Sequence, residues 1–206
     1  AIFTIVALLC ALSPHRAAQA TETTAILTGL NGAQGSDYVI SLNQSFFVER
    51  FPGKLWRINM TDLTSSAIGT GYNEPMDIAV SADNAHAYVI ENADGGTLLR
   101  VDLANANRVM ATVVSTNIAG ISGHILTQIA LDEAHNYAYV VQNSGVGSIW
   151  RINLTDGAKV AVLTDILTTF GSFPSGLLLT NDLAFAYFTT LGTDGKVIRL
   201  DLSTNE

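Results

Sequence analysis

Charged residues and cysteine are both scarce in this chain of 206 residues. Only 14% of the residues are charged, the net charge is −8, and no cluster of Lys or Arg occurs anywhere. This acidic balance argues against a nucleic-acid surface or an anionic membrane as the partner. The sole cysteine, Cys10, lies in an apolar segment near the amino end, so the remainder of the chain has no disulfide to form.

The sequence motifs of several enzyme classes are missing as well. No Gly-rich phosphate loop, CxxC pair or HExxH pattern is present, and no Ser or Cys stands in a nucleophile elbow. Stretches with the period of an amphipathic helix are absent, whereas alternation with a period of two runs along the chain. The sequence therefore predicts an all-β protein without a complete catalytic signature.

What the chain does contain is a short string that recurs four times. Each copy places an arginine among apolar residues, with Asn or Asp two positions later. The copies are Leu55–Asn59, Leu98–Asp102, Ile149–Asn153 and Val197–Asp201. Their arginines lie 43, 51 and 48 residues apart, which is the period of a four-stranded propeller blade.

The repeat extends well beyond this string. In the last three copies a tyrosine stands 12 residues before the arginine, and an alternating apolar stretch with a polar turn precedes that tyrosine. A further strand is expected after each of the first three arginines, at 66–69, 109–114 and 160–163. We therefore predict a β-propeller of four-stranded antiparallel blades, with four blades present.

Two arrangements of these blades stay open. The last copy stops before a fourth strand, while residues 24–28 have the pattern of such a strand. If that segment pairs with the last blade, the blades form a closed four-bladed ring without an unpaired sheet edge. The alternative, a fragment of a six- to eight-bladed propeller, is favoured because the chain begins without Met inside an apolar segment and four-bladed rings are rare.

Residues 1–20 resemble a secretory signal peptide that is truncated at its start. The apolar segment from Ile2 to Leu12 is followed by a small-residue cleavage pattern at 18–20, so the propeller domain is expected to span residues 21–206. About 12 apolar residues are too few for a membrane span of roughly 20. We expect the protein to be secreted, periplasmic or at the cell surface, with no transmembrane span in the mature chain.

Positions at which the copies differ indicate where local chemistry is required. One position on the expected innermost strand holds Asp77 or Gln128. Another, at the end of the second strand, holds Glu49 or Glu91, and Asn143 follows the equivalent place in the third copy. These oxygens would approach the propeller axis and hold a divalent cation such as calcium. The alternative is that they cap strand ends and satisfy the backbone of turns.

His124 and the repeated arginines each allow two interpretations. His124, just before an expected innermost strand, would serve as a general base near the axis, or it is a loop histidine without a chemical role. The arginines would form a ring of anion binders, or each would pin its blade to the next one by a hydrogen-bonded ion pair. Repetition in every copy favours the structural role of the arginines.

The copy from Pro75 through Tyr88 to Leu103 resembles the NHL and YVTN classes of propeller repeat, and the likeness covers nearly all of residues 24–206. This resemblance implies a secreted or cell-surface protein, in a group that includes adhesins, sugar-lactone hydrolases, streptogramin-lyase-like enzymes and interaction modules. Thr190 and Leu191 depart from the YVTN pattern, because the asparagine of that motif is missing there.

These observations leave two main functions open. The favoured one is a noncatalytic exported propeller that binds a protein or carbohydrate ligand through the loops 92–96, 143–147 and 191–195. The alternative is a metal-dependent hydrolase or lyase of small cyclic esters, with the oxygen ligands named above and His124 as base. A purely structural repeat within a larger surface protein is a third possibility.

Overall fold

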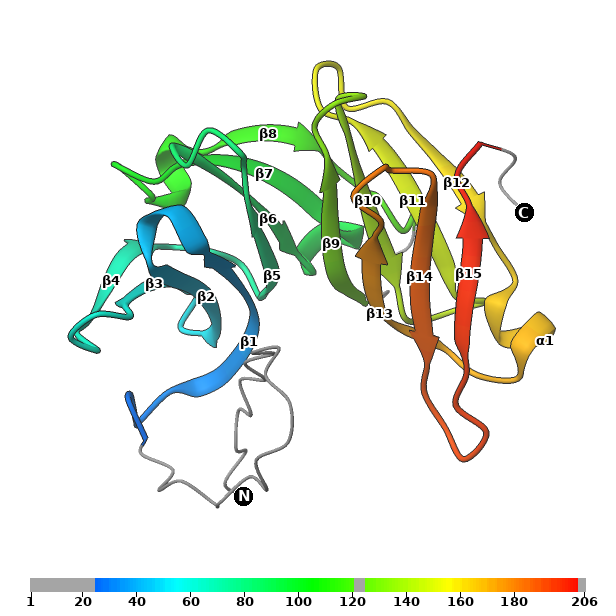
Figure 1. The fold of residues 1–206 in the computed structure, drawn as a ribbon, viewed down its shortest axis with the longest axis horizontal. Helices are drawn as coiled ribbons and strands as arrows, with labels where there is room; N and C mark the ends of the chain where they lie inside the picture. The colour runs from blue at the N-terminus through cyan, green and yellow to red at the C-terminus, as the bar shows by residue number, and fades with distance from the viewer. Residues whose placement is uncertain (1–24, 121–124, 204–206) are drawn as a thin grey trace, which may run out of the picture.

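Four antiparallel sheets fan around a common centre as the blades of a β-propeller (Figure 1). The computed structural model describes residues 25–120 and 125–203, so the expected signal peptide at 1–20 lies outside the described part. The prediction of an all-β propeller is confirmed. Within those described ranges, no helix has the length and apolar character that crossing a membrane requires.

Each blade is a meander whose strands follow one another outward from the centre. Blade 1 contains β1 (Asn31–Val39), β2 (Gln44–Phe51), β3 (Lys54–Asn59) and β4 (Ser65–Thr70); blade 2 contains β5 (Pro75–Val80), β6 (His86–Glu91), β7 (Thr97–Asp102) and β8 (Thr112–Ser115). Blade 3 contains β9 (Leu126–Asp132), β10 (Tyr137–Gln142), β11 (Ser148–Asn153) and β12 (Lys159–Leu163); blade 4 contains β13 (Pro174–Leu179), β14 (Phe185–Thr190) and β15 (Val197–Asp201).

Short helical turns occupy some of the connections between strands. The α-helix α1 (Ile166–Phe170) joins β12 to β13, although no helical period marks it in the sequence. Three 3-10 turns are η1 (Ile40–Leu42), η2 (Ala93–Gly95) and η3 (Arg108–Met110). Because η3 takes up the start of the expected strand 109–114, β8 begins later, at Thr112.

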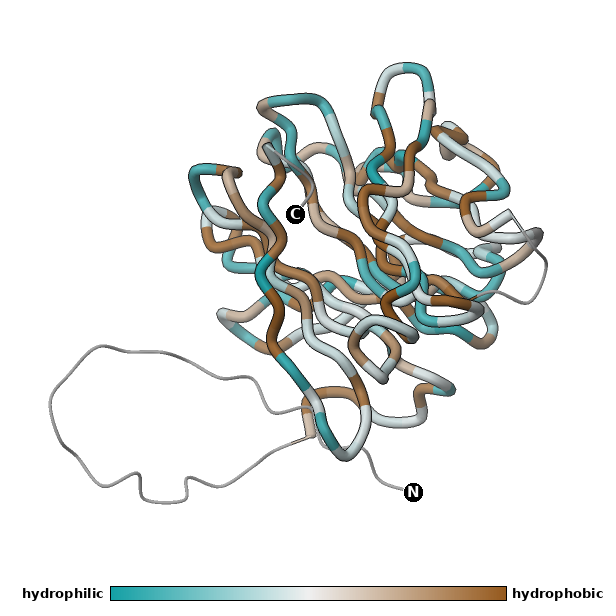
Figure 2. The backbone as a smooth tube through the Cα atoms, turned by 90° about the vertical axis from the view of Figure 1, so that its right-hand side faces the viewer, coloured by the Kyte–Doolittle hydropathy of each residue, from teal (hydrophilic) through white to brown (hydrophobic). Residues whose placement is uncertain are grey.

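Apolar side chains pack between successive blades and form the core. Figure 2 shows hydrophobic residues along the strands and hydrophilic residues at many of the turns. Ile90 and Leu98 of blade 2 pack in one cluster with Val140 and Ile152 of blade 3. Equivalent clusters lie between blades 1 and 2 and between blades 3 and 4. Both faces of a central blade are therefore buried, which explains why apolar residues occur at successive positions of its strands.

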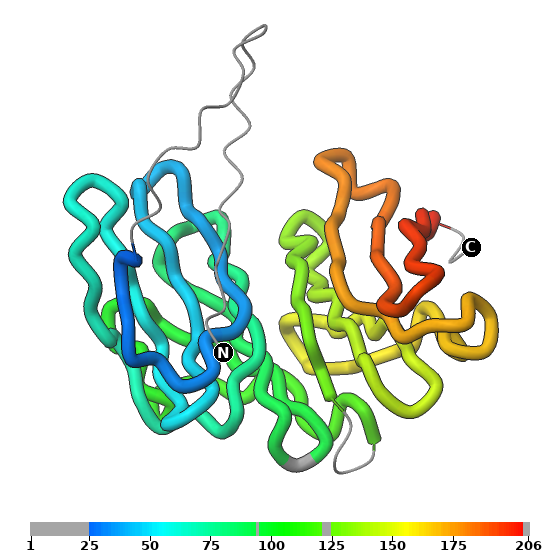
Figure 3. Tube along the Cα trace, turned by 90° about the horizontal axis from the view of Figure 1, so that it is seen from below, coloured from blue at the N-terminus to red at the C-terminus, as the bar shows by residue number. Residues whose placement is uncertain are grey.

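The far face of blade 4 carries no further sheet in the part of the chain described. Val197 is 74% exposed, whereas the residues at the same repeat position, Leu55, Leu98 and Ile149, are completely buried. Blades 1 and 4 stand at the two ends of an arc (Figures 1 and 3). Residues 25–30, which include most of the segment that would close a four-bladed ring, form no strand, and blade 4 has three strands within the described residues.

The expectation that the repeated arginines form ion pairs with the next blade is wrong, because none of the four makes an ion pair within residues 25–120 and 125–203. Two of them contact aromatic rings instead. The guanidinium carbon of Arg151 lies 4.8 Å from the ring centroid of Tyr137, and that of Arg199 lies 4.6 Å from the ring centroid of Phe185. In both pairs the ring belongs to the second strand of the same blade. These arginines therefore stack within their blade as cation–π pairs, a contact that needs no carboxylate.

The repeat supplies a matched pair of core substitutions. Ile149→Ala is expected to lower the free energy of unfolding by about 2–5 kcal/mol, because it leaves a cavity between blades 3 and 4. Val197→Ala, at the equivalent but exposed position, is expected to change it by less than about 0.5 kcal/mol. Urea denaturation followed by tryptophan fluorescence measures both, and equal losses would contradict this assignment of the two faces.

Candidate functional site

Polar side chains on the innermost strands bind the backbone of the next blade. Oδ2 of Asp77, in β5, accepts a hydrogen bond from the N–H of Ile129, in β9, at 2.9 Å. The side-chain oxygen of Gln128, in β9, accepts one from the N–H of Leu177, in β13, at 2.6 Å. Since Asp77 and Gln128 occupy the same repeat position, the two bonds are equivalent. A carboxylate and an amide thus do the same structural work.

Asp77 is enclosed by three blades. Its side chain is 4% exposed, and Oδ1 lies so close to β1 that a Cβ added at Gly35 would stand 1.7 Å from it. Burial raises the pKa of Asp77 to about 7. The hydrogen bond from Ile129 opposes this rise, and the negative charge of Asp37 adds to it. The carboxylate of Asp37 itself accepts a hydrogen bond from the Val80 N–H at 2.7 Å.

The raised pKa of Asp77 predicts a specific pH dependence of stability. The folded state binds the proton of the Asp77 carboxyl group more tightly than the unfolded state does. The protonated carboxyl therefore adds to the free energy of unfolding below pH 4, and this stabilisation is lost as the pH rises to about 7. Asp77→Asn keeps an oxygen for Ile129 and removes the charge. The gain in the free energy of unfolding caused by this substitution is therefore expected to be larger at pH 8 than at pH 4, by on the order of 4 kcal/mol at most.

Chemical denaturation between pH 4 and pH 8 measures this difference. Gln128→Glu is the reciprocal control, since it places a carboxylate at the equivalent position and is expected to introduce a decline in stability over the same range. Parallel pH profiles for the unsubstituted chain and Asp77→Asn would show that Asp77 does not titrate in this window.

Glu49 is used within its own blade. This side chain is 4% exposed and stands at the end of β2. Its Oε1 accepts a hydrogen bond from the N–H of Asn31, where β1 begins, and Oε2 accepts one from the indole N–H of Trp56, both at 2.9 Å. Both carboxylate oxygens thus tie strands of blade 1 together, as a structural cap does.

Glu91 occupies the same repeat position in blade 2 and is completely buried. It accepts a hydrogen bond from the N–H of Asn73 at 2.7 Å. Arg108 donates from Nε to Oε1 at 2.8 Å and from Nη2 to Oε2 at 2.9 Å, which forms a two-pronged ion pair. The Glu91 charge also adds to the effect of burial in raising the pKa of the nearby Tyr72 hydroxyl. A paired guanidinium is what allows this carboxylate to be buried.

Removal of Arg108 is therefore expected to be costly. Arg108→Met leaves the carboxylate of Glu91 buried without its cation, and the free energy of unfolding is expected to fall by about 3–5 kcal/mol. The double variant Arg108→Met with Glu91→Gln is expected to recover part of this loss. Thermal melting of the three proteins checks the coupling, and additive effects of the two substitutions would rule it out.

The remaining candidates do not join these carboxylates in one cluster. Asn143 follows β10, where its N–H donates to the carbonyl of Ile125 at 2.7 Å. His124 lies outside the described residues. Within residues 25–120 and 125–203, no three His, Cys, Asp or Glu side chains are placed to hold a metal ion together. Asp77 and Gln128 lie on β5 and β9, the innermost strands of blades 2 and 3. Glu49 and Glu91 lie near the ends of second strands, where each already accepts the hydrogen bonds described above.

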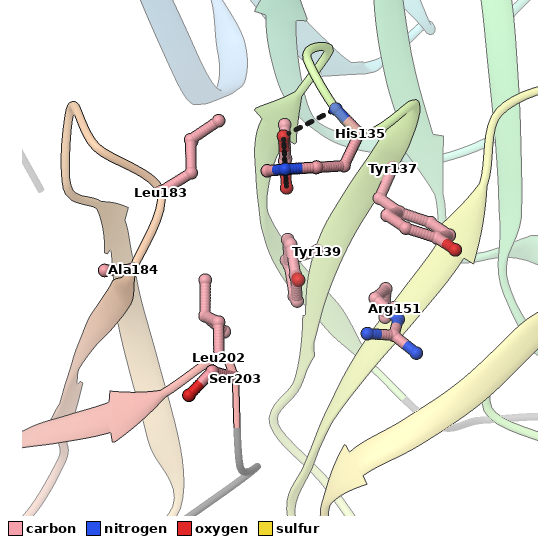
Figure 4. Close-up of a pocket in the computed structure, with 9 residues that line it drawn as sticks. His135, Tyr137, Tyr139, Arg151, Leu183, Ala184, Leu202 and Ser203 are labelled. Carbon is pink, nitrogen blue, oxygen red and sulfur yellow. Dashed lines mark hydrogen bonds and ion pairs between the residues drawn. The ribbon is translucent and has the colours of Figure 1, made fainter.

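A groove of about 300 Å³ lies between blades 3 and 4, and none of the sequence patterns indicated it. Figure 4 shows the side chains that line it. They are Asp132, His135, Tyr137, Tyr139 and Arg151 from blade 3, and Leu183, Ala184, Leu202 and Ser203 from blade 4. One wall is thus polar and aromatic, and the other is largely apolar.

The polar wall of this groove is held in place by its own contacts. Asp132, 3% exposed, accepts a hydrogen bond from the His135 N–H at 3.0 Å, and its Oδ2 lies 2.9 Å from Nδ1 of that histidine. Burial raises the pKa of the Tyr139 hydroxyl, and a hydrogen bond with Arg151 partly opposes the rise. Asp132, His135, Tyr139 and Arg151 are therefore held by contacts within the protein.

In each blade a turn joins the first strand to the second, and the contacts between these turns differ at the groove from those at the other blade pairs. Between blades 1 and 2, the side-chain N–H of Asn84 donates to the hydroxyl of Ser41 at 3.0 Å. Between blades 2 and 3, the N–H of Ala82 donates to the carboxylate of Glu133 at 2.7 Å. In blade 4 the position of Asn84 is held by Leu183, whose side chain points toward the groove in Figure 4. The left-handed residue of this turn is Asn43, Asn84 and Asn136 in the other three blades, and the leucine in its place was the available sequence signal.

Comparisons with known proteins support the fold and only the fold. No protein-family model and no curated protein sequence matches the chain. Among solved structures, it resembles a calcium-binding protein, regucalcin, from Agrobacterium tumefaciens, with a TM-score of 0.66, 14% identity, and coverage of 86% of this chain and 56% of that one. The chain also resembles a gluconolactonase from Xanthomonas campestris, with a TM-score of 0.68, 10% identity, and coverage of 85% of this chain and 60% of that one.

A putative TolB from Agrobacterium tumefaciens gives a TM-score of 0.68 at 11% identity, with coverage of 88% of this chain and 62% of that one. The chain thus spans less than two thirds of the length of these structures. Their folds are those of regucalcin-like, gluconolactonase-like and TolB-like propellers, and the chain is accordingly a β-propeller repeat protein.

Proposed function

We propose that this protein is an exported propeller of the NHL/YVTN type that binds a protein or carbohydrate ligand without transforming it. The groove between blades 3 and 4 is the observation that carries the proposal, because a pocket with one polar and one apolar wall interrupts the repeat there. Export rests on the leader pattern at 1–20, with residues 21–206 as the mature domain.

The polar residues outside the groove favour this proposal over catalysis. Asp77 and Gln128 hold the next blade, and Glu91 is paired with Arg108 through both of its oxygens. To bind a cation, Glu91 would first have to release a guanidinium from a buried ion pair, which is costly. The frame is therefore rigid, and rigidity is what a recognition surface requires.

The second candidate is a metal-dependent hydrolase or lyase of small cyclic esters. Structural likeness to a gluconolactonase and to a calcium-binding propeller favours it. Asp77, Gln128 and Asn143 would then offer oxygen ligands near the axis, with His124 as base. Calcium would supply a Lewis acid for an ester carbonyl, and the chain would have to position the ester beside it.

Thermal melting with calcium and with a chelator distinguishes the two candidates. A binding module without a resident ion is expected to melt at the same temperature in both solutions. A tight ion at 100 times its dissociation constant would add about 2.7 kcal/mol of stability and raise the melting temperature by several degrees. Binding to a glycan array and hydrolysis of gluconolactone are then measured on the same preparation. Calcium-dependent lactone hydrolysis would replace the proposed function with the second candidate.

A further inference from the structure

We propose that the groove between blades 3 and 4 is a binding site for a small, neutral saccharide. In this site Leu183 and Leu202 contact the C–H face of a sugar ring, and the side chains of blade 3 bind its hydroxyl groups. The inference rests on the proposed function and deepens it, since it assigns a location and a ligand class.

The conformation of Leu183 is the first reason. Its φ is 57°, in the left-handed region, which a bulky side chain adopts at a cost that Asn largely avoids. The turn of blade 2 has the same hydrogen bonds, from Ser81 to Asp83 there and from Thr180 to Asp182 here, and it places Asn84 at this position with φ 58°. Leucine is therefore not what the turn itself requires.

The direction of the Leu183 side chain is the second reason. Asn84 uses its side chain to bind the preceding blade, whereas Leu183 presents an apolar surface to a groove. Leu202 and Ala184 continue the same wall. An apolar patch of this kind gains free energy only when something covers it, and the C–H face of a pyranose ring has the matching chemistry.

The opposite wall sets the ligand class. Arg151 donates hydrogen bonds, and the second ring nitrogen of His135, whose side chain is 62% exposed, either donates or accepts, so hydroxyl groups of either orientation find partners. Asp132 and Tyr139, 3% and 2% exposed, hold these two side chains from within the wall. The one carboxylate of the groove, Asp132, is bonded to His135 and offsets the charge of Arg151, which favours a neutral ligand over an anion or a cation. A volume of about 300 Å³ lies at the lower limit for ligand pockets and suits a single sugar residue.

The test compares two leucines that share the same strained conformation. Leu63 has φ 61° in the turn between β3 and β4 of blade 1, away from the groove, and its side chain is 45% exposed. Leu183→Asn and Leu63→Asn each replace a left-handed leucine with a residue that tolerates this φ. Neither variant is expected to lose stability, so a loss of binding in one of them does not reflect unfolding.

Binding is measured by NMR titration of the full chain with glucose, galactose, mannose, N-acetylglucosamine and, as the charged comparison, glucuronate. At least one neutral sugar is expected to shift amide resonances of residues 132–139 and 183–184. Leu183→Asn is expected to weaken this binding about tenfold, equal to about 1.4 kcal/mol, through the loss of apolar contact. Leu63→Asn is expected to leave it unchanged, and Leu183→Met to retain most of it.

Each other outcome overturns the inference in a recognisable way. If a sugar binds Leu183→Asn as tightly as the unsubstituted chain, the groove is not the site, although the proposed binding function stands. If glucuronate binds at least as well as every neutral sugar and depends on Arg151, the assigned ligand class is wrong. If none of the five sugars shifts a resonance, the saccharide site is refuted and the proposed function is left with a protein ligand.

Discussion

A blade of this propeller is stable only against its neighbours, and the rest of the structure depends on that constraint. Each sheet has two apolar faces, and water is excluded from both only where a sheet stands on either side. The complete burial of Ile149 and the 74% exposure of Val197 show the difference that one neighbouring sheet makes at an equivalent position. Stability therefore accumulates from junction to junction, as in other repeat proteins.

Apolar packing holds the blades together, and hydrogen bonds between them set their relative position. Apolar contact tolerates small shifts, whereas a hydrogen bond from a side chain to a strand backbone does so much less. Asp77 and Gln128 each bind one N–H of the following inner strand and thereby fix the register of adjacent blades. This role accounts for polar residues near the axis without any ligand. It also has a cost, since Asp77 carries its carboxyl into a site where burial raises its pKa.

The groove between blades 3 and 4 is a local exception on a frame that otherwise repeats. At the first two junctions, hydrogen bonds link neighbouring turns; at the third, Leu183 faces open space beside Tyr139 and Asp132. A repeat protein gains a site at little structural cost when one junction changes and the others maintain the fold. Leu183 is the turn residue that differs at this groove, whereas Tyr139 and Arg151 of the opposite wall belong to the repeat.

The sequence by itself determined the blades, their order and most strand positions, since the period of two, the turn residues and the recurring arginine string are local properties of the chain. Only the tertiary structure decided which partner each polar side chain meets. The contacts of Asp77 and Gln128 span 52 and 49 residues, and Arg108 meets Glu91 across 17 residues that include strand β7. Such pairs depend on how whole sheets pack, and the groove beside Leu183 exists only because two blades meet there.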